Sequence, residues 1–344
     1  MKKILQLLLC TLIYLSVQSC STNNEYLNPE QFYSLKDTLK GEMLSTPIES
    51  KNGSIRLYYT EYGLLACTRS DSNIFQLLDS TNATRIMATG KRGRGPNEFL
   101  TTMGMQYDYE TNQFSVFDMY RQELVTYLVS SDSISLIKSI NLKRDVQSVK
   151  YINDSLLVFI DFYPHQKIGL INTKAEIIYE EEYNPLDDNR IKTTDRYHNA
   201  KLDISPNKKY TVAIDGNFPL VKVFINKPDT LELKWKKMLF EPKYNVNSQK
   251  NWYIQHDDNY LGFTSLYLTN EYIYLKCDDM QVLDFKTGAP TSKHTYILVM
   301  DYEGNIVNKY LLDKFFAPFT VSPNGKSLYA VIYDPDFLIA KYSL

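Results

Sequence analysis

One short pattern recurs six times along the chain, and it constrains the fold more than any other feature. Each copy consists of a turn residue and an apolar strand, and most copies end on an acid. The copies begin at Glu61, Asn112, Asn153, Asn207, Asn270 and Asn324. The last five copies begin 41, 54, 63 and 54 residues apart, close to the period of about 40–50 residues that is typical of propeller blades.

A second hairpin follows the repeated strand, with β-branched and aromatic residues alternating around Gly, Asn or Asp turns. Residues 167–172 and 175–183 are one example, and residues 295–300 and 305–312 are another. Each unit therefore supplies four short antiparallel strands, which is one blade. We expect an all-β fold, a six-bladed β-propeller with four-stranded antiparallel blades.

Composition supports this expectation. The chain of 344 residues has 28 Tyr and is 13% aromatic, which favours strands over helices. Its 38 Lys and Arg against 40 Asp and Glu give a formal charge of −2, so no basic field favours nucleic acid as a partner.

The sixth unit is incomplete. After its repeated strand only one further strand remains, at residues 337–344, and a three-stranded blade would leave the ring open at a frayed edge. The chain has a spare strand-like segment at residues 32–39, ahead of the first unit. We expect residues 32–39 to pair with residues 337–344 and to close the ring with an N-terminal strand. The alternative is a loose N-terminal arm.

The first twenty residues have the features of an export signal. A cationic start at Lys2 and Lys3 precedes an apolar run over residues 4–17, which is too short to be a permanent membrane span. The following Val-Gln-Ser-Cys sequence, ending at Cys20, resembles the bacterial lipoprotein box. This resemblance implies cleavage before Cys20, lipidation of its thiol and acylation of the new amine, which together give stable anchoring. An ordinary secretory signal with an incidental Cys is the alternative.

These features predict residues 1–19 as a lipoprotein signal peptide, residues 20–30 as a flexible tether and residues 31–344 as a single propeller domain. Removing residues 1–19 deletes two Lys and no acid, so the mature charge is 36 − 40 = −4. The predicted location is the cell envelope, lipid-anchored and at the outer membrane, with the periplasmic or surface face left open.

Two cysteines, Cys67 and Cys277, remain in the predicted mature domain. Both lie in strand-like apolar runs, so we expect two separately buried thiols rather than a disulfide. No CxxC, HExxH or paired-His spacing indicates a metal site, and no cofactor is predicted.

Two kinds of segment resemble known propellers. The Ser-Pro-Asn turns at residues 205–210 and 322–329 resemble the Ser-Pro-Asp-Gly-Lys hairpins of TolB-type propellers. Residues 90–99, GKRGRGPNEF, resemble the Gly-Lys-x-Gly-x-Gly-Pro-x-Glu-Phe loop of the six-bladed, TolB-like β-propeller lipoproteins of Bacteroidetes. The resemblance implies a propeller over nearly all of the mature chain and supplies no established activity.

The loop at residues 90–99 is the first candidate site. Its glycines permit exposed backbone N–H groups that could hold an anion beside Lys91, Arg92 and Arg94. The alternative is a blade connector in which the glycines follow a tight path and Phe99 fills the core between blades. The three cations indicate an acidic partner.

The second candidate site lies in an apparent insertion before Asn270, because the spacing to this copy is the longest. Aromatic residues stand beside amide and carboxylate groups there, as in sugar-binding sites. The candidate ligand-binding residues are Trp252, Tyr253, His256, Asp257 and Asp258. The alternative is an ordinary loop between blades.

Other polar groups give weaker signals. The acid pairs at residues 187–188, 257–258 and 278–279 could meet Ca²⁺, but no Asp-x-Asp-x-Asp-Gly loop is present, which favours solvated surface acids. The four histidines are scattered over different units and form no recognisable catalytic set. They are His165, His198, His256 and His294.

Two functions follow from this sequence. The first is a membrane-anchored lipoprotein whose propeller is a scaffold for a protein or glycan ligand, with no catalytic residues. The second is a metal-dependent propeller enzyme, similar to lactonases or lyases, acting on a small or carbohydrate-derived substrate. The two functions differ in how polar side chains are arranged around the channel. An enzyme needs acids, Asn or His from several blades to lie together at one end of the channel.

Overall fold

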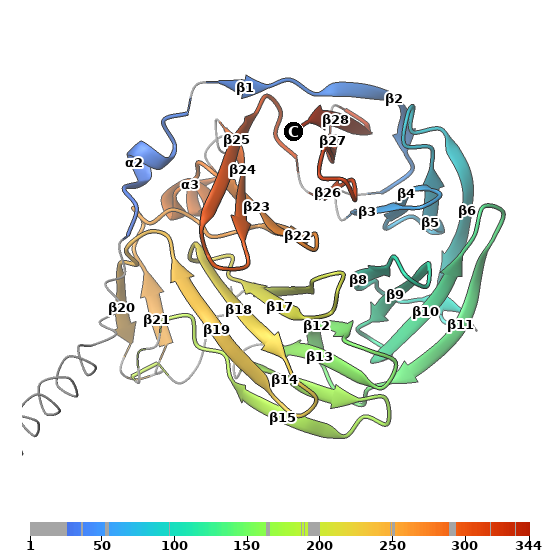
Figure 1. The fold of residues 1–344 in the computed structure, drawn as a ribbon, viewed down its shortest axis with the longest axis horizontal. Coiled ribbons are helices and arrows are strands. Elements are labelled where there is room, and N and C mark those ends of the chain that lie inside the picture. The colour runs from blue at the N-terminus through green and yellow to red at the C-terminus, as the bar shows by residue number, and fades with distance from the viewer. Residues whose placement is uncertain are drawn as a thin grey trace, which may run out of the picture.

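The repeated strands each occupy the second position in one of six sheets arranged around a central axis (Figure 1). The computed structural model describes residues 26–344 except 36, 52–54, 96, 163–165, 187, 189, 192–199, 248, 250–251, 289–293, 317 and 334. The fold is an all-β six-bladed propeller with mainly four-stranded antiparallel blades, as the repeat predicted.

The first three blades are described here from the axis outwards. Blade 1 contains β3 (Arg56–Thr60), β4 (Gly63–Cys67), β5 (Ser72–Leu78) and β6 (Arg85–Arg92), with β7 (Glu98–Phe99) parallel to its edge. Blade 2 contains β8 (Met103–Asp108), β9 (Gln113–Asp118), β10 (Glu123–Val129) and β11 (Ile134–Asn141). Blade 3 contains β12 (Val146–Tyr151), β13 (Leu156–Asp161), β14 (Lys167–Asn172) and β15 (Ile177–Glu182).

The remaining blades follow the same order. Blade 4 contains β16 (Lys201–Ile204), β17 (Tyr210–Ile214), β18 (Leu220–Asn226) and β19 (Leu231–Met238). Blade 5 contains β22 (Ser265–Leu268), β23 (Tyr272–Asp278), β24 (Thr295–Asp301) and β25 (Ile306–Leu312). Blade 6 contains β26 (Phe319–Val321), β27 (Ser327–Tyr333), β28 (Phe337–Ser343) and β2 (Glu42–Ile48).

The hydrophobic core is divided among the six interfaces between neighbouring blades. Strands β4 and β17 are buried along their whole length because each blade is covered on both faces. At the interface of blades 1 and 2, for example, Phe75 packs against Phe114 with ring centroids 5.0 Å apart. Cys67 and Cys277 are both buried and free, which confirms the prediction of two separate thiols.

An N-terminal strand closes the ring, but the predicted segment was wrong. Strand β2 (Glu42–Ile48) pairs antiparallel with β28, with Leu44 opposite Ile339 and Ile48 opposite Phe337. Residues 32–39 lie elsewhere. Phe32 ends the short helix α2 (Pro29–Phe32), and β1 (Thr38–Leu39) pairs parallel with β25 on the outer edge of blade 5. In Figure 1 this N-terminal segment runs along the outside of blades 5 and 6.

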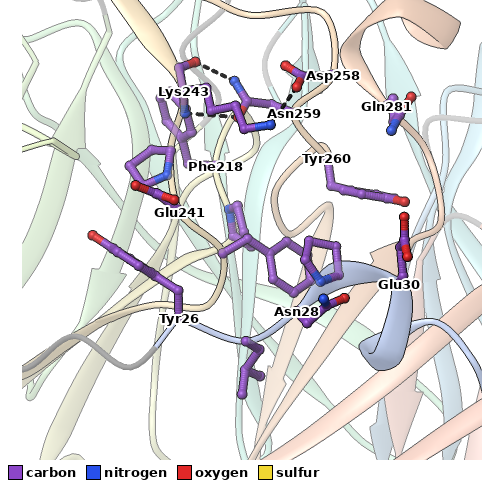
Figure 2. Close-up of a pocket in the computed structure, with 15 residues that line it drawn as sticks. Tyr26, Asn28, Glu30, Phe218, Glu241, Lys243, Asp258, Asn259, Tyr260 and Gln281 are labelled. Carbon is purple, nitrogen blue, oxygen red and sulfur yellow. Dashed lines mark hydrogen bonds and ion pairs between the residues drawn. The ribbon is translucent and has the colours of Figure 1, made fainter.

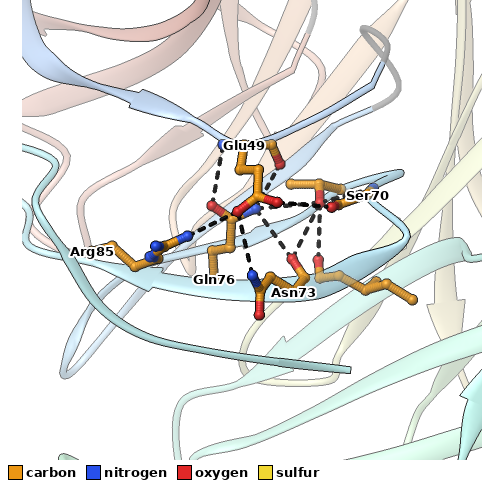
Figure 3. Close-up of polar contacts among 7 residues, drawn as sticks. Glu49, Ser70, Asn73, Gln76 and Arg85 are labelled. Carbon is orange, nitrogen blue, oxygen red and sulfur yellow. Dashed lines mark hydrogen bonds and ion pairs between the residues drawn. The ribbon is translucent and has the colours of Figure 1, made fainter. Parts of the chain in front are cut away.

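A polar network joins the end of β2 to blade 1 (Figure 3). The Gln76 amide of β5 donates to the Glu49 carbonyl oxygen at 2.7 Å, and its own oxygen accepts from the Glu49 N–H at 3.3 Å. Arg85 donates to the Glu49 carboxylate at 2.9 Å. The strand that completes blade 6 is therefore also bonded to blade 1.

The segment before β2 contacts the propeller over several residues. Leu27 donates its N–H to the Leu239 carbonyl at 2.7 Å, and the Asn28 side chain caps α2. Phe32 and Tyr33 are buried with residues of blades 4 and 5. The domain boundary at residue 31 stays a prediction. These contacts hold Leu27, Phe32 and Tyr33 against the ring.

The predicted insertion before Asn270 is present. Strands β20 (Tyr244–Asn247) and β21 (Trp252–Gln255) form a separate two-stranded hairpin between blades 4 and 5, and helix α3 (Val282–Thr287) follows β23. The chain enters blade 5 at Gly262, where there is no room for a side chain. A Cβ at this position would lie 2.1 Å from the Asp215 carbonyl oxygen.

Candidate functional site

The inner strands of all six blades line one cavity on the ring axis, which we call the axial cavity. Its volume is about 550 Å³, within the range of small-molecule sites. The lining residues lie mainly at the ends where β3, β8, β12, β16, β22 and β26 begin. The ring thus brings together side chains that are far apart in the sequence.

Six charged side chains line the axial cavity in the described part of the chain. The cations are Arg56, Lys150, Lys201 and Lys276, and the acids are Asp203 and Asp278. Four cations and two acids give a formal charge of 4 − 2 = +2, although the whole chain is slightly acidic. Low-dielectric walls strengthen such a local field, so the axial cavity attracts anions.

The first ion pair joins blades 3 and 4. The Lys150 ammonium lies 3.3 Å from an Asp203 carboxylate oxygen, and the two residues are 3% and 8% exposed. Lys150 also donates to the Tyr58 hydroxyl at 3.3 Å and to the Met105 carbonyl. Burial lowers the pKa of Lys150, and the Asp203 charge partly offsets that decrease. This pair satisfies both of its buried charges.

The second ion pair lies within β23. The Lys276 ammonium is 2.5 Å from an Asp278 oxygen and 3.1 Å from the Thr264 hydroxyl. The Thr295 hydroxyl donates to the other Asp278 oxygen at 2.8 Å. Lys276 also stands 4.8 Å from the centroid of the Phe315 ring, a cation–π contact.

Arg56 and Lys201 differ from these pairs. Among the described residues, neither side chain has a carboxylate within ion-pair distance, and Lys201 donates only to the Thr264 carbonyl. Burial lowers the pKa of Lys201, and the nearby charges of Arg56 and Lys276 act in the same direction, which together bring it to about 8. The excess positive charge of the axial cavity therefore belongs to these two residues.

Aromatic side chains form much of the remaining wall. Tyr267 hydrogen-bonds to Tyr109, with 2.5 Å between the hydroxyl oxygens, and burial raises the pKa of Tyr267 to about 12. Phe285 of α3 and Phe315 line the axial cavity although they are 64% and 51% exposed. These two rings offer an apolar surface to a ligand.

Sequence reasoning missed this site. It interpreted Asp278 as a solvated surface acid, and that was wrong, because Asp278 is 4% exposed and paired with Lys276. The available signal was a lysine directly after an apolar residue, at Lys150 after Val149 in β12 and at Lys276 after Leu275 in β23. Burying a charged side chain without an oppositely charged partner costs free energy, so a lysine in such a strand indicates an acid beside it.

The glycine-rich loop already holds an anion of its own chain. The Glu98 carboxylate accepts the Gly95 N–H at 2.8 Å, and a Cβ on Gly93 would lie 2.1 Å from a Glu98 oxygen. Phe99 is 3% exposed and packs edge-on against Phe75 at 5.4 Å. The loop is thus a connector that wraps around Glu98 and fills the core between blades 1 and 2.

The three cations of this loop lie on the surface. Lys91, Arg92 and Arg94 are exposed, at the edge of blade 1. No ion pair joins them to an acid in the described part of the chain. An acidic partner for them stays a prediction.

The residues predicted for a sugar site are not gathered in one pocket. Tyr253 is 2% exposed, packs against Phe218 at 5.3 Å and accepts a hydrogen bond from Asn217 at 2.8 Å. Asp257 forms an exposed ion pair with Lys286 at 2.6 Å. His256 is exposed, and the side chain of Trp252 lies outside the described residues.

Asp258 does line a pocket, together with the N-terminal segment (Figure 2). This pocket has a volume of about 570 Å³ and is bordered by Tyr26, Glu30 and Tyr260. The Lys243 ammonium binds Asp258 at 2.5 Å, and the Asn259 amide donates to the Lys243 carbonyl at 2.5 Å. Ligand binding by this predicted set remains untested.

Metal-binding side chains do not converge in the described part of the chain. No group of three or more His, Cys, Asp or Glu there could hold a metal ion, and both acids of the axial cavity are engaged by lysines. Asp187, His165 and His198 lie outside the described residues. No helix among the described residues is long and apolar enough to span a membrane.

Comparisons with known proteins agree with this architecture. The profile of a family described as TolB-like 6-blade propeller-like matches residues 48–324. No curated protein matches the chain. Among solved structures, an exported protein of Bacteroides fragilis has a TM-score of 0.56 at 13% identity, covering 88% of this chain and 94% of that chain.

A second solved structure is the β-propeller domain of Cps50 (Swd1) from Myceliophteria thermophila. Its TM-score is 0.50 at 10% identity, covering 88% of this chain and 99% of that chain. At these identities the two structures support the fold alone.

Proposed function

This chain belongs to the TolB-like family of six-bladed propellers, and we propose that its ring is a binding scaffold that takes a small organic anion in the axial cavity. The observation that carries the proposal is the pair of cations without carboxylate partners, Arg56 and Lys201. Two neighbouring lysines in the same cavity each have an acid, so the excess charge is specific to these two positions.

The energetics favour an anionic ligand. Arg56 and Lys201 are partly buried. A cation that is partly removed from water without a partner costs free energy, and an incoming carboxylate, sulfate or phosphate would offset that cost. Arg56 can bind such a group through two parallel hydrogen bonds. Phe285 and Phe315 would contact the apolar part of the same molecule. The ligand class is therefore an organic anion with a small apolar body.

Calorimetric titration with citrate, benzoate and glucuronate tests this proposal. We expect at least one of them to bind, and Arg56→Gln and Lys201→Met each to weaken binding by about tenfold or more, because each removes a charged hydrogen-bond donor. Affinity should fall as the pH rises through about 8, because Lys201 loses its charge there.

Lys326→Met is the matched control, since Lys326 is exposed on the turn between β26 and β27. Lys201→Met should also raise the melting temperature, because it removes a partly buried charge that has no carboxylate within ion-pair distance among the described residues. Equal binding by the wild type, Arg56→Gln and Lys201→Met would contradict the proposal.

The lipid anchor is a second part of the proposed function. Cys20 lies seven residues before Leu27, which contacts the ring. A chain of that length spans at most about 25 Å, so lipidation at Cys20 would hold the propeller close to the membrane. We propose that the protein is an envelope lipoprotein at the outer membrane, and that a protein or glycan partner meets it there.

Cys20→Ala is expected to abolish lipidation, leaving the precursor unprocessed by the lipoprotein peptidase or releasing a soluble form. The measurement is fractionation of cells into membrane and soluble material, with detergent partition of each fraction. Cys67→Ala is a suitable control because Cys67 is buried in the ring. Normal detergent partition of the Cys20→Ala protein would count against the anchor.

A further inference from the structure

The lysines of the axial cavity fall into two chemical classes. Lys150 and Lys276 each contact a carboxylate, that of Asp203 and that of Asp278. Lys201 has no such partner among the described residues and donates to a neutral carbonyl, that of Thr264. Thr264 also accepts from Lys276 through its hydroxyl at 3.1 Å, so a second cation lies near Lys201.

We propose that Lys201 forms a reversible imine with 2-oxo acids, while the Arg56 guanidinium binds their carboxylate. This inference rests on the proposed anion site and names its ligand class. A 2-oxo acid places a carbonyl carbon directly beside its carboxylate, which suits a cavity with one anion-binding cation and one lysine that can act as a nucleophile. The small apolar end of the molecule would face Phe285 and Phe315.

The chemistry balances without any further reactant. The neutral Lys201 amine attacks the carbonyl carbon, a C–N bond forms, and the carbonyl π electrons move to oxygen, which takes a proton. The two hydrogens of the amine leave with that oxygen as water, and a C=N bond remains. Nothing is oxidised or reduced, and hydrolysis reverses the step.

Two features of Lys201 favour the neutral amine that this step requires. Its pKa is lowered to about 8 by burial and by the charges of Arg56 and Lys276. Lysines activated in this way, by desolvation and a neighbouring cation, are known nucleophiles for carbonyl groups. At neutral pH the neutral fraction of Lys201 exceeds that of an ordinary lysine by roughly a hundredfold. Arg56 is a second cation in the same cavity, so it can bind the carboxylate while Lys201 reacts with the carbonyl.

The test is reductive trapping of the full mature domain with pyruvate and cyanoborohydride at about pH 8, where half of Lys201 is neutral. A trapped imine raises the mass of one lysine by that of pyruvate less one oxygen atom, and peptide mapping identifies the lysine. We expect labelling of Lys201 at least tenfold above that of exposed Lys326 in the same sample. Lys201→Arg should lose the trapped product, and benzoate should compete with it.

Calorimetry with lactate on the wild type separates the two proposals, because lactate has the carboxylate but no carbonyl. Selective labelling of Lys201 supports the imine. Lactate binding without selective labelling would overturn the imine and leave the anion site standing. Absence of both lactate binding and labelling would overturn both. Circular dichroism of Lys201→Arg shows whether a lost product reflects lost folding.

Discussion

A variant that lacks residues 26–48 is expected to lose the cooperative unfolding transition of the propeller. The deletion removes β2, the outer strand of blade 6, and with it Leu44 and Ile48, each 3% exposed between blades 6 and 1. Each lost side chain of this kind costs about 2–5 kcal/mol. The ladder to β28 and the bonds between Glu49 and Gln76 are disturbed as well. The total approaches the roughly 5–15 kcal/mol by which domains are stable.

Urea unfolding followed by tryptophan fluorescence and circular dichroism measures this effect. A chain that begins at Tyr26 is the control and should unfold as the full mature domain does. Removing only residues 26–40 should give an intermediate loss, because it deletes buried Phe32 and Tyr33 but retains β2. An unchanged urea midpoint for the variant lacking residues 26–48 would refute the closure by β2.

Asp203→Asn is expected to destabilise the folded protein by about 3–5 kcal/mol, because Lys150 would then stand buried without its carboxylate. The double variant Lys150→Met/Asp203→Leu should recover most of this loss, since it removes both charges together. Urea midpoints of the three proteins measure the effect. A single variant as stable as the wild type would show that the pair contributes nothing to the fold.

The pH dependence of Asp203→Asn has a definite sign. Burial lowers the pKa of Lys150 in the folded state, so between that pKa and the ordinary lysine value the unfolded chain binds more protons. Stability then rises with pH over this window. The deficit of Asp203→Asn relative to the wild type should therefore shrink as the pH increases toward the ordinary pKa of lysine. A deficit independent of pH would indicate a cause other than the Lys150 charge.

The sequence identified the blades because each repeated strand carries its own signal. A run of apolar residues between turn residues is complete within one blade, so no information from elsewhere in the chain is needed. Strand β2, which closes the ring, has no such run of apolar residues, because it contains Pro47 and three polar residues. Proline is tolerated there since β2 is an edge strand, where one missing N–H breaks no central ladder. Residues 32–39 have the more strand-like sequence, yet Phe32 is required in the core beside blades 4 and 5.

The axial cavity could not be predicted for a different reason. Arg56, Lys150, Lys201 and Lys276 belong to four blades, and each stands directly beside an apolar residue in its strand. Only the closed ring brings their charges to one place. Sequence spacing also cannot distinguish a paired lysine from an unpaired one, because Asp203 pairs with Lys150 across a blade boundary rather than with Lys201 two residues away.

The pairing of β2 with β28 has a consequence for how the chain becomes complete. Translation produces residues 42–48 well before residues 337–343, so β2 has no ring partner until β28 has been made. A chain that has lost either strand leaves the edge of the other unpaired at this seam, and such an edge promotes aggregation and proteolysis. Closure of the ring therefore requires both strands in one chain, because only then are both edges paired.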